Sequence, residues 1–101
     1  MSLAKSEDVQ NWLEKFPEWK LGQDHSVPCL ERTYAFKTYL ASIACTQEIA
    51  NAAEEMDHHP TILIQWRKIT ISLYTHDKGG ITHLDFQLAE KMEKIYENRY
   101  L

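Results

Sequence analysis

The chain contains 101 residues, of which 44% are hydrophobic and 26% charged, and its formal net charge is −4. This composition is typical of one folded domain over residues 1–101 and excludes a largely disordered chain. Lysine and arginine form no dense cluster, so binding to a nucleic-acid backbone, which needs a positive face, is disfavoured. No apolar run predicts a membrane span and no secretory signal is recognisable, so we expect a cytoplasmic protein whose cysteines, Cys29 and Cys45, are free thiols.

The N-terminal part of the sequence predicts a short helix and a hairpin. The helix is expected to have Ser6 as its cap and to end before Pro17. Its apolar residues fall on one face: Val9, Trp12, Leu13 and Phe16. We expect a short strand over residues 19–21 and a longer one over residues 27–36, on either side of a turn region that contains Gly22, Gln23, Asp24 and Ser26.

A longer helix should follow, with Thr38 as its cap and its end near residue 57. Two apolar stripes run along it. One comprises Phe36, Leu40, Ile43, Ala44 and Ala50, and the other comprises Ala41, Cys45, Ile49, Ala52 and Met56. A surface helix normally carries a single stripe, so one stripe should cover a sheet and the other should face a neighbouring helix or another subunit. The pattern favours a homo-oligomer, although a well-buried helix in a small domain also explains it.

The C-terminal half predicts a second hairpin and a last helix. Residues 61–66 are apolar and β-prone, and Ile69, Ile71 and Leu73 alternate with polar residues. The turn is expected near residues 67–68, but Arg-Lys is a poor turn pair, so the loop length stays open. Thr82 should cap the last helix. Two hairpins separated by a helix predict an α+β domain with a four-stranded antiparallel sheet and three helices on one face.

Two adjacent histidines end the middle helix. His58 and His59 stand directly before Pro60, and a residue before proline is disfavoured in helical geometry. The helix should therefore end at the histidines, and a strand should begin just after them. The two imidazoles would be held by rigid elements on both sides.

The expected hairpin places a third histidine beside these two. If residues 67–68 form the loop, Trp66 faces Ile69, and counting back places His59 opposite His76. Directly opposed residues have Cβ atoms roughly 4.5–5.5 Å apart. The spacing therefore predicts that His58, His59 and His76 surround one small pocket at the open end of the hairpin.

Two carboxylates could support these imidazoles. Glu54 precedes His58 by four residues and would share its helical face, although it is equally explained as a solvated helix residue. Asp85 follows the glycine pair at residues 79–80, which could fold it back over the pocket. With Thr82 it also fits a variant of the capping box, and the two roles can coexist.

Other interpretations of the histidines remain open. Adjacent histidines at a helix C-terminus can simply interact favourably with the helix dipole. Three histidines and a carboxylate could bind zinc, but adjacent histidines are awkward ligands and no H-E-x-x-H motif is present. A Cys–His nucleophile is disfavoured because both cysteines lie inside predicted elements. His25 and His83 have no evident partner and should lie on the surface.

The motif as a whole resembles the pterin-4a-carbinolamine dehydratases. That family's pattern is an acidic residue, His-His-Pro, an aromatic residue, a further histidine and an aspartate at fixed spacings. Here these positions are Glu54, His58-His59-Pro60, Trp66, His76 and Asp85. The segment THDKGGITHLD is similar to another family segment, with Ile81 in place of the usual leucine. The resemblance is strongest over residues 32–89, and Trp19-Lys20-Leu21 resembles a family Trp-x-Leu.

The resemblance implies a fold, an assembly and a reaction. The fold is a four-stranded antiparallel sheet with three helices on one face, which agrees with the order of elements above. Family members form dimers or tetramers by joining sheets and packing helices. They dehydrate a 4a-hydroxytetrahydropterin to a quinonoid dihydropterin, which regenerates the pterin cofactor of aromatic amino-acid hydroxylases, and they need no metal or bound cofactor.

The resemblance also implies residue roles. His58 and His76 would be acid–base groups on either side of the 4a carbon, and His59 would hold the pterin, with some acid–base capacity. Glu54 would support His58, and Asp85 would brace His76 or its loop. The residues expected to contact the pterin are Asp57, His59, Tyr74, Thr75, His76, Asp77 and Trp19.

A second class of function is compatible with the same family. Some members bind a homeodomain transcription factor and stabilise its dimer, which would permit a nuclear location, and others are divergent assembly proteins that lack the histidines. All three histidines are present here, which favours catalysis. Nothing in the sequence favours a transcription-factor partner.

Overall fold

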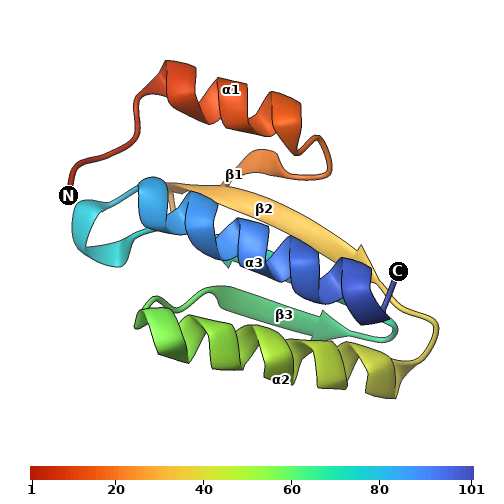
Figure 1. Cartoon of the computed structure of the whole chain (residues 1–101). Coiled ribbons are helices and arrows are strands. Elements are labelled where there is room, and N and C mark those ends of the chain that lie inside the picture. Colours follow the sequence, from red (N-terminus) through yellow and green to blue (C-terminus); the bar gives the residue numbers. More distant parts are fainter.

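The structure is a computed structural model that describes residues 1–101. Its elements are α1 (Ser6–Lys15), β1 (Lys20–Asp24), β2 (Val27–Ala35), α2 (Tyr39–Met56), β3 (Thr61–Gln65), β4 (Lys68–Leu73), the 3₁₀ turn η1 (His76–Lys78) and α3 (His83–Arg99). All strand pairs are antiparallel and the spatial order is β1-β2-β4-β3. The three helices cover one face of this sheet (Figure 1). The predicted α+β fold is confirmed.

The core lies between the sheet and the helices. Ile69, Ile71 and Leu73 of β4 are fully buried, whereas the intervening residues of the strand are not. This alternation is what a strand with one covered face requires. The same apolar cluster contains Ile49 of α2 and Met92 of α3, so both long helices pack onto the central strands.

The middle helix buries one of its two stripes within the chain. As predicted, Thr38 caps α2 by accepting a hydrogen bond from the Ala41 N–H (3.0 Å). Cys45 and Ile49 are fully buried inside this one chain, so their stripe needs no second subunit. Leu40, from the other stripe, is 74% exposed. The stripe without a partner is thus the one that contains Leu40.

No helix of the chain has the length and apolar character that crossing a membrane requires.

The N-terminal elements differ from the prediction at two points. Ser6 is the first residue of α1, and Lys5 precedes it as the cap without a side-chain hydrogen bond. β1 continues to Asp24, where a turn region was expected. The turn is only His25-Ser26, and both residues have positive φ (49° and 70°). A two-residue turn of this kind matches the strand twist, so pairing extends to its edge.

The second hairpin turns one residue earlier than expected. Gln65 pairs with Lys68, so the loop is Trp66-Arg67, with Arg67 at φ 61°. The predicted pairing of Trp66 with Ile69 is therefore wrong, and the register differs by two residues. The paired ladder ends at Thr61 and Ser72. His59 and His76 consequently do not face each other across the hairpin.

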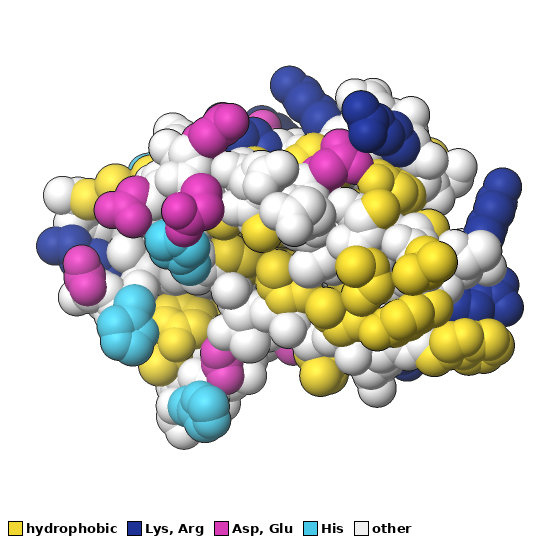
Figure 2. Space-filling view, turned by 90° about the horizontal axis from the view of Figure 1, so that it is seen from below, with side chains coloured by type: hydrophobic (Ala, Val, Ile, Leu, Met, Phe, Trp, Pro, Cys, Tyr) yellow, Lys and Arg dark blue, Asp and Glu magenta, His cyan; other side chains and the backbone are white.

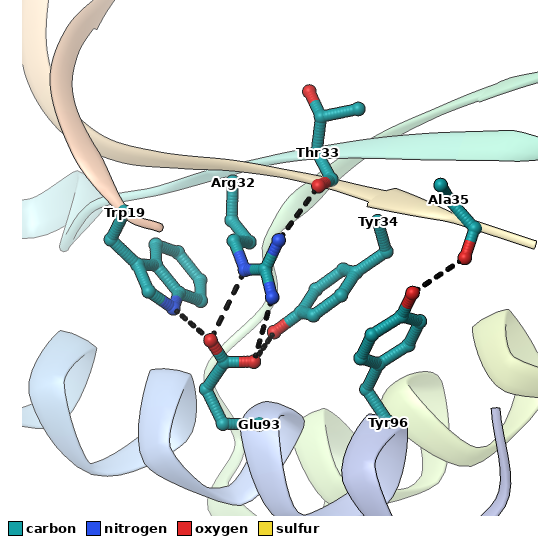
Figure 3. A network of polar contacts seen from close by, with 7 residues as sticks. All are labelled: Trp19, Arg32, Thr33, Tyr34, Ala35, Glu93 and Tyr96. Atoms are coloured by element: carbon teal, nitrogen blue, oxygen red, sulfur yellow. Dashed lines mark hydrogen bonds and ion pairs between the residues drawn. The ribbon is translucent and has the colours of Figure 1, made fainter. Parts of the chain in front are cut away.

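A buried carboxylate joins α3 to the sheet (Figure 3). Glu93 accepts hydrogen bonds from Trp19 Nε1 (3.1 Å), Arg32 Nε (3.1 Å) and the Tyr34 hydroxyl (2.9 Å). The Arg32 guanidinium lies over the Tyr34 ring at 4.1 Å from its centroid. Burial and the Glu93 carboxylate raise the pKa of Tyr34 well above its usual range, so this hydroxyl remains a donor.

Candidate active site

The end of α2 positions His58 and His59. Asp57 adopts the left-handed conformation (φ 49°), and its N–H donates to the carbonyls of Ala53 and Glu54. The His58 N–H also donates to Ala53 O, at 3.0 Å. These bonds satisfy carbonyls that a helix end would otherwise leave free, and they turn the chain out of the helix. The two histidines therefore leave the helix at a fixed angle.

The turn after β4 positions His76. The Thr75 N–H donates to Gly80 O (2.8 Å), and the Gly79 N–H donates back to Thr75 O (3.0 Å). Gly79 has φ 68°, a conformation that favours glycine. The chain therefore folds back immediately after the strand, and His76 starts η1 at the fold.

The three histidines line one cavity of about 250 Å³. Its walls are Asp57, His58, His59, Tyr74, Thr75, His76, Asp77 and Leu84. The convergence comes from the helix end and the η1 turn, whereas the sequence argument relied on a cross-strand pairing that the hairpin does not make. Two larger hollows, of about 380 and 400 Å³, lie elsewhere, but neither gathers more than one imidazole.

His58 is paired with Asp85. Its Nε2 lies 2.6 Å from Asp85 Oδ1, and the Asp85 side chain is fully buried. The other carboxylate oxygen accepts the Thr82 N–H (2.8 Å), which completes the capping box at the start of α3. The expected capping role is confirmed. Asp85 was expected to brace His76 or its loop: it makes no hydrogen bond to His76, but it accepts one from the Thr75 hydroxyl next to the loop (2.9 Å), and it also contacts His58.

His59 is paired with Glu54. Its Nε2 lies 2.6 Å from Glu54 Oε1, and both side chains are mostly exposed. The expectation that Glu54 supports His58 is corrected: the end of the helix rotates the adjacent imidazoles apart, and His59 is the one that reaches this carboxylate. Such an exposed pair stabilises the fold little but can orient the ring.

These contacts determine which ring nitrogens remain for a ligand. His58 uses Nε2 for Asp85, so only its Nδ1 is left. His58 Nδ1 makes no hydrogen bond, and no fully buried polar side-chain atom lacks a partner, so Nδ1 is accessible to solvent, and His58 lines the pocket. His76 makes no side-chain hydrogen bond, and its ring lies 6.1 Å from that of Tyr74. The pocket thus offers two tethered imidazoles, those of His58 and His59, and one free imidazole, that of His76.

Trp19 lies outside the pocket. It is only 2% exposed, packs in the core and donates to Glu93 (Figure 3). Its expected contact with a substrate is therefore corrected. The other residues expected to contact substrate all line the cavity: Asp57, His59, Tyr74, Thr75, His76 and Asp77.

The arrangement does not resemble a metal or thiol site. No group of three or more histidine, cysteine or acidic side chains is placed to hold a metal ion. Cys29 and Cys45 are both buried. Burial raises the pKa of Cys45 to about 12 and also raises that of Cys29, so neither is a thiolate nucleophile near neutral pH.

The chain is similar to known sequences over most of its length. The profile of the family described as pterin 4 alpha carbinolamine dehydratase matches residues 2–95. A relative from Mycolicibacterium smegmatis is 38% identical over 95 residues, which cover 94% of this chain and 97% of the relative. One from Microcystis aeruginosa is 35% identical over 94 residues, which cover 93% and 81%. Both relatives are provisionally named pterin-4-alpha-carbinolamine dehydratases.

Solved structures share the fold. A protein from Brucella melitensis described as a transcriptional coactivator/pterin dehydratase superposes with a TM-score of 0.84 at 24% identity, covering 93% of this chain and 98% of that one. A pterin dehydratase-like protein described as a RuBisCO assembly factor in the alpha-carboxysome gives 0.65 at 20% identity, covering 77% and 88%. At these identities the likeness shows the fold alone.

The fold and the pocket together define a class, namely small α+β proteins with histidines gathered where a helix end meets a turn. The sequence comparison shows the family. The chain belongs to the pterin-4a-carbinolamine dehydratase family.

Proposed function

We propose that this protein dehydrates a 4a-hydroxytetrahydropterin to a quinonoid dihydropterin and water. The observation that carries the proposal is the single cavity lined by His58, His59 and His76. Family membership supports a pterin as the substrate. The reaction would return the pterin cofactor to aromatic amino-acid hydroxylases.

The reaction needs two proton transfers. The lone pair of the ring nitrogen next to the 4a carbon forms the new C=N bond while the C–O bond breaks. The departing hydroxide must receive a proton, and the ring nitrogen must lose one. Imidazoles suit both tasks, each worth typically ~10²–10⁴-fold. We assign these transfers to His58, through Nδ1, and to His76, whose ring is free.

The remaining pocket residues would hold the ring. His59, oriented by Glu54, stands beside the two proton-transfer groups and would position the pterin. Asp57 and residues 74–77 line the same cavity, and their main-chain groups would receive the polar edge of the ring. Asp85 would act behind His58, since it contacts the imidazole and does not line the cavity.

A coupled assay tests the function. An aromatic amino-acid hydroxylase generates the carbinolamine, and formation of the quinonoid product is followed with and without this protein. The protein should accelerate formation above the uncatalysed rate, and treatment with a chelator should leave that acceleration unchanged. No acceleration by folded protein would refute the proposal and favour an interaction module such as a transcription-factor cofactor. Loss of rate that zinc restores would favour a metal site.

We also propose that the protein assembles through α2 and β3. Apolar side chains gather on the face seen in Figure 2, and this part of the chain exposes Tyr39, Leu40, Leu63, Ile64 and Trp66. β3 is an outer strand, so its outer edge has no pairing partner within the chain. An exposed apolar edge of this kind is a template for pairing with another strand. A second copy of the chain would cover both the edge and the Leu40 stripe.

Charge substitutions on this face should lower the oligomer mass. Leu40→Glu and Ile64→Glu place charges where a subunit contact would bury them, so light scattering should report a smaller particle, while circular dichroism should still report a folded chain. Leu21→Glu, on the outer strand β1, is the matched control because Leu21 is 51% exposed. Ile49→Glu should instead unfold the chain, since Ile49 is fully buried. A monomeric native protein would contradict the assembly.

A further inference from the structure

Thr75 holds parts of the pocket with both its side chain and its backbone. Its hydroxyl donates to Asp85 Oδ2 (2.9 Å), and the other oxygen of that carboxylate contacts His58. Its carbonyl accepts the N–H groups of Lys78 (3.1 Å) and Gly79 (3.0 Å), which close the η1 turn around His76. One residue therefore joins the two imidazoles that are assigned to proton transfer.

The hydrogen bonds around Thr75 can run in only one direction. Thr75 has one hydroxyl proton, and it is donated to Asp85. The contact of 2.7 Å between the Thr75 and Thr82 hydroxyls must then be donated by Thr82, which itself accepts from the Leu84 N–H (3.3 Å). Thr82 and Asp85 are fully buried and Thr75 is 8% exposed, so water does not compete for these bonds.

Two donors point at the same oxygen of the Asp85 carboxylate. Asp85 Oδ2 receives the Thr75 hydroxyl and the Thr82 N–H, which leaves Oδ1 for His58 Nε2. A carboxylate has no proton to donate, so the hydrogen bond between Asp85 Oδ1 and His58 is donated by His58 Nε2, which leaves Nδ1 for the substrate. An aspartate that sets the tautomer of a catalytic histidine in this way is a known device of acid–base sites.

We propose that Thr75 is a positioning residue for the dehydratase reaction. Its hydroxyl fixes the rotation of the Asp85 carboxylate, and the carboxylate fixes the tautomer and the angle of the His58 ring. Without the hydroxyl, Oδ2 keeps only the Thr82 N–H, so the carboxylate can rotate and the His58 ring can follow it. This inference rests on the proposed function for its effect on rate, but its effect on His58 is independent of any activity.

The kinetic test compares substitutions at Thr75. Thr75→Val keeps the shape and removes the hydroxyl, so kcat should fall roughly ten- to hundredfold, the range for one lost hydrogen bond to a charged group. KM should change little, because the Thr75 hydroxyl is occupied by Asp85. Thr75→Ser should restore most of the rate. Thr70→Val is the matched control, since it removes a Thr–Thr contact from the same region of the sheet, with Thr33, outside the pocket.

A spectroscopic test needs no activity. Nitrogen-15 NMR of the labelled imidazoles should show His58 protonated on Nε2 in the native protein, in Thr75→Ser and in Thr70→Val, and altered in Thr75→Val. If the valine variant does not fold, Thr75→Cys takes its place, because a thiol of similar size is a weak donor. A variant without the hydroxyl that keeps both the native kcat and the native His58 signal overturns the inference. If native protein lacks dehydratase activity, the proposed function fails, and the NMR comparison still decides whether Thr75 positions His58.

Discussion

Glu93→Ala should destabilise the protein by about 3–5 kcal/mol, the range for removing one partner of a buried ion pair. The substitution leaves the largely buried Arg32 side chain without its carboxylate, and it also removes the acceptor of Trp19 and Tyr34. Stabilities of domains this size lie at about 5–15 kcal/mol, so a substantial part of the free energy of unfolding is lost. Denaturant unfolding followed by tryptophan fluorescence measures the change, and Trp19 reports it directly.

Two further variants separate the network from the helix that carries it. Glu97→Ala, four residues along α3, removes an exposed carboxylate and should leave the unfolding midpoint within error. Arg32→Met combined with Glu93→Gln removes both charges and keeps an acceptor for Trp19 and Tyr34, so it should lose less stability than Glu93→Ala alone. A midpoint of Glu93→Ala equal to that of Glu97→Ala would show that the buried network contributes nothing.

The sequence was sufficient to predict those features that depend on local rules. Alternating Ile69, Ile71 and Leu73 identify a strand with one covered face, and all three are buried. Thr38 caps α2, and the helix ends just before His58, as the proline at position 60 requires. Periodicity, caps and proline constraints are properties of neighbouring residues, which is why they can be read along a chain.

Turn conformations could not be predicted in the same way. Both hairpins use two-residue turns in which non-glycine residues take positive φ, namely Ser26 and its neighbour in one and Arg67 in the other. Such residues carry no strong sequence signal, because the glycine or asparagine that normally marks these turns is absent. A turn placed one residue late shifts the register by two, which explains why the predicted cross-strand pairing of the histidines was wrong.

The hydrogen-bond partners of buried polar residues could not be predicted from local sequence rules either. Asp85 and His58 are far apart in sequence, and so are Trp19 and Glu93, so only the packed structure decides these pairs. One signal was available for the second pair. Glu93 lies between Ala89 and Tyr96 on the buried side of α3, and a carboxylate on an apolar helix face needs buried donors. Its donors could not be named, because tertiary contacts select them.

Replacing both histidines that are proposed to transfer protons, His58 and His76, should reduce turnover to the uncatalysed background. His76→Ala removes a ring that makes no hydrogen bond, so it should fold normally and lose roughly 10²–10⁴-fold in kcat. His58 requires a different substitution, because alanine would leave the buried Asp85 carboxylate without one of its donors. His58→Gln keeps an amide that can donate to Asp85 and cannot shuttle a proton, so the rate loss should appear with little loss of stability.

His59→Ala should instead raise KM more than it lowers kcat, since its proposed task is to hold the ring.

The double variant His58→Gln/His76→Ala gives the decisive comparison. Because the dehydration also proceeds without an enzyme, the uncatalysed rate is subtracted from every measurement, and the thermal midpoint is recorded for each variant. His25→Ala/His83→Ala is the matched control, since both of its residues are exposed histidines outside the pocket, and it should keep the native kcat. A folded double variant with near-native kcat would show that the imidazoles do not transfer protons. The histidines beside Pro60 would then be a structural feature of the end of α2, and the protein would act by binding alone.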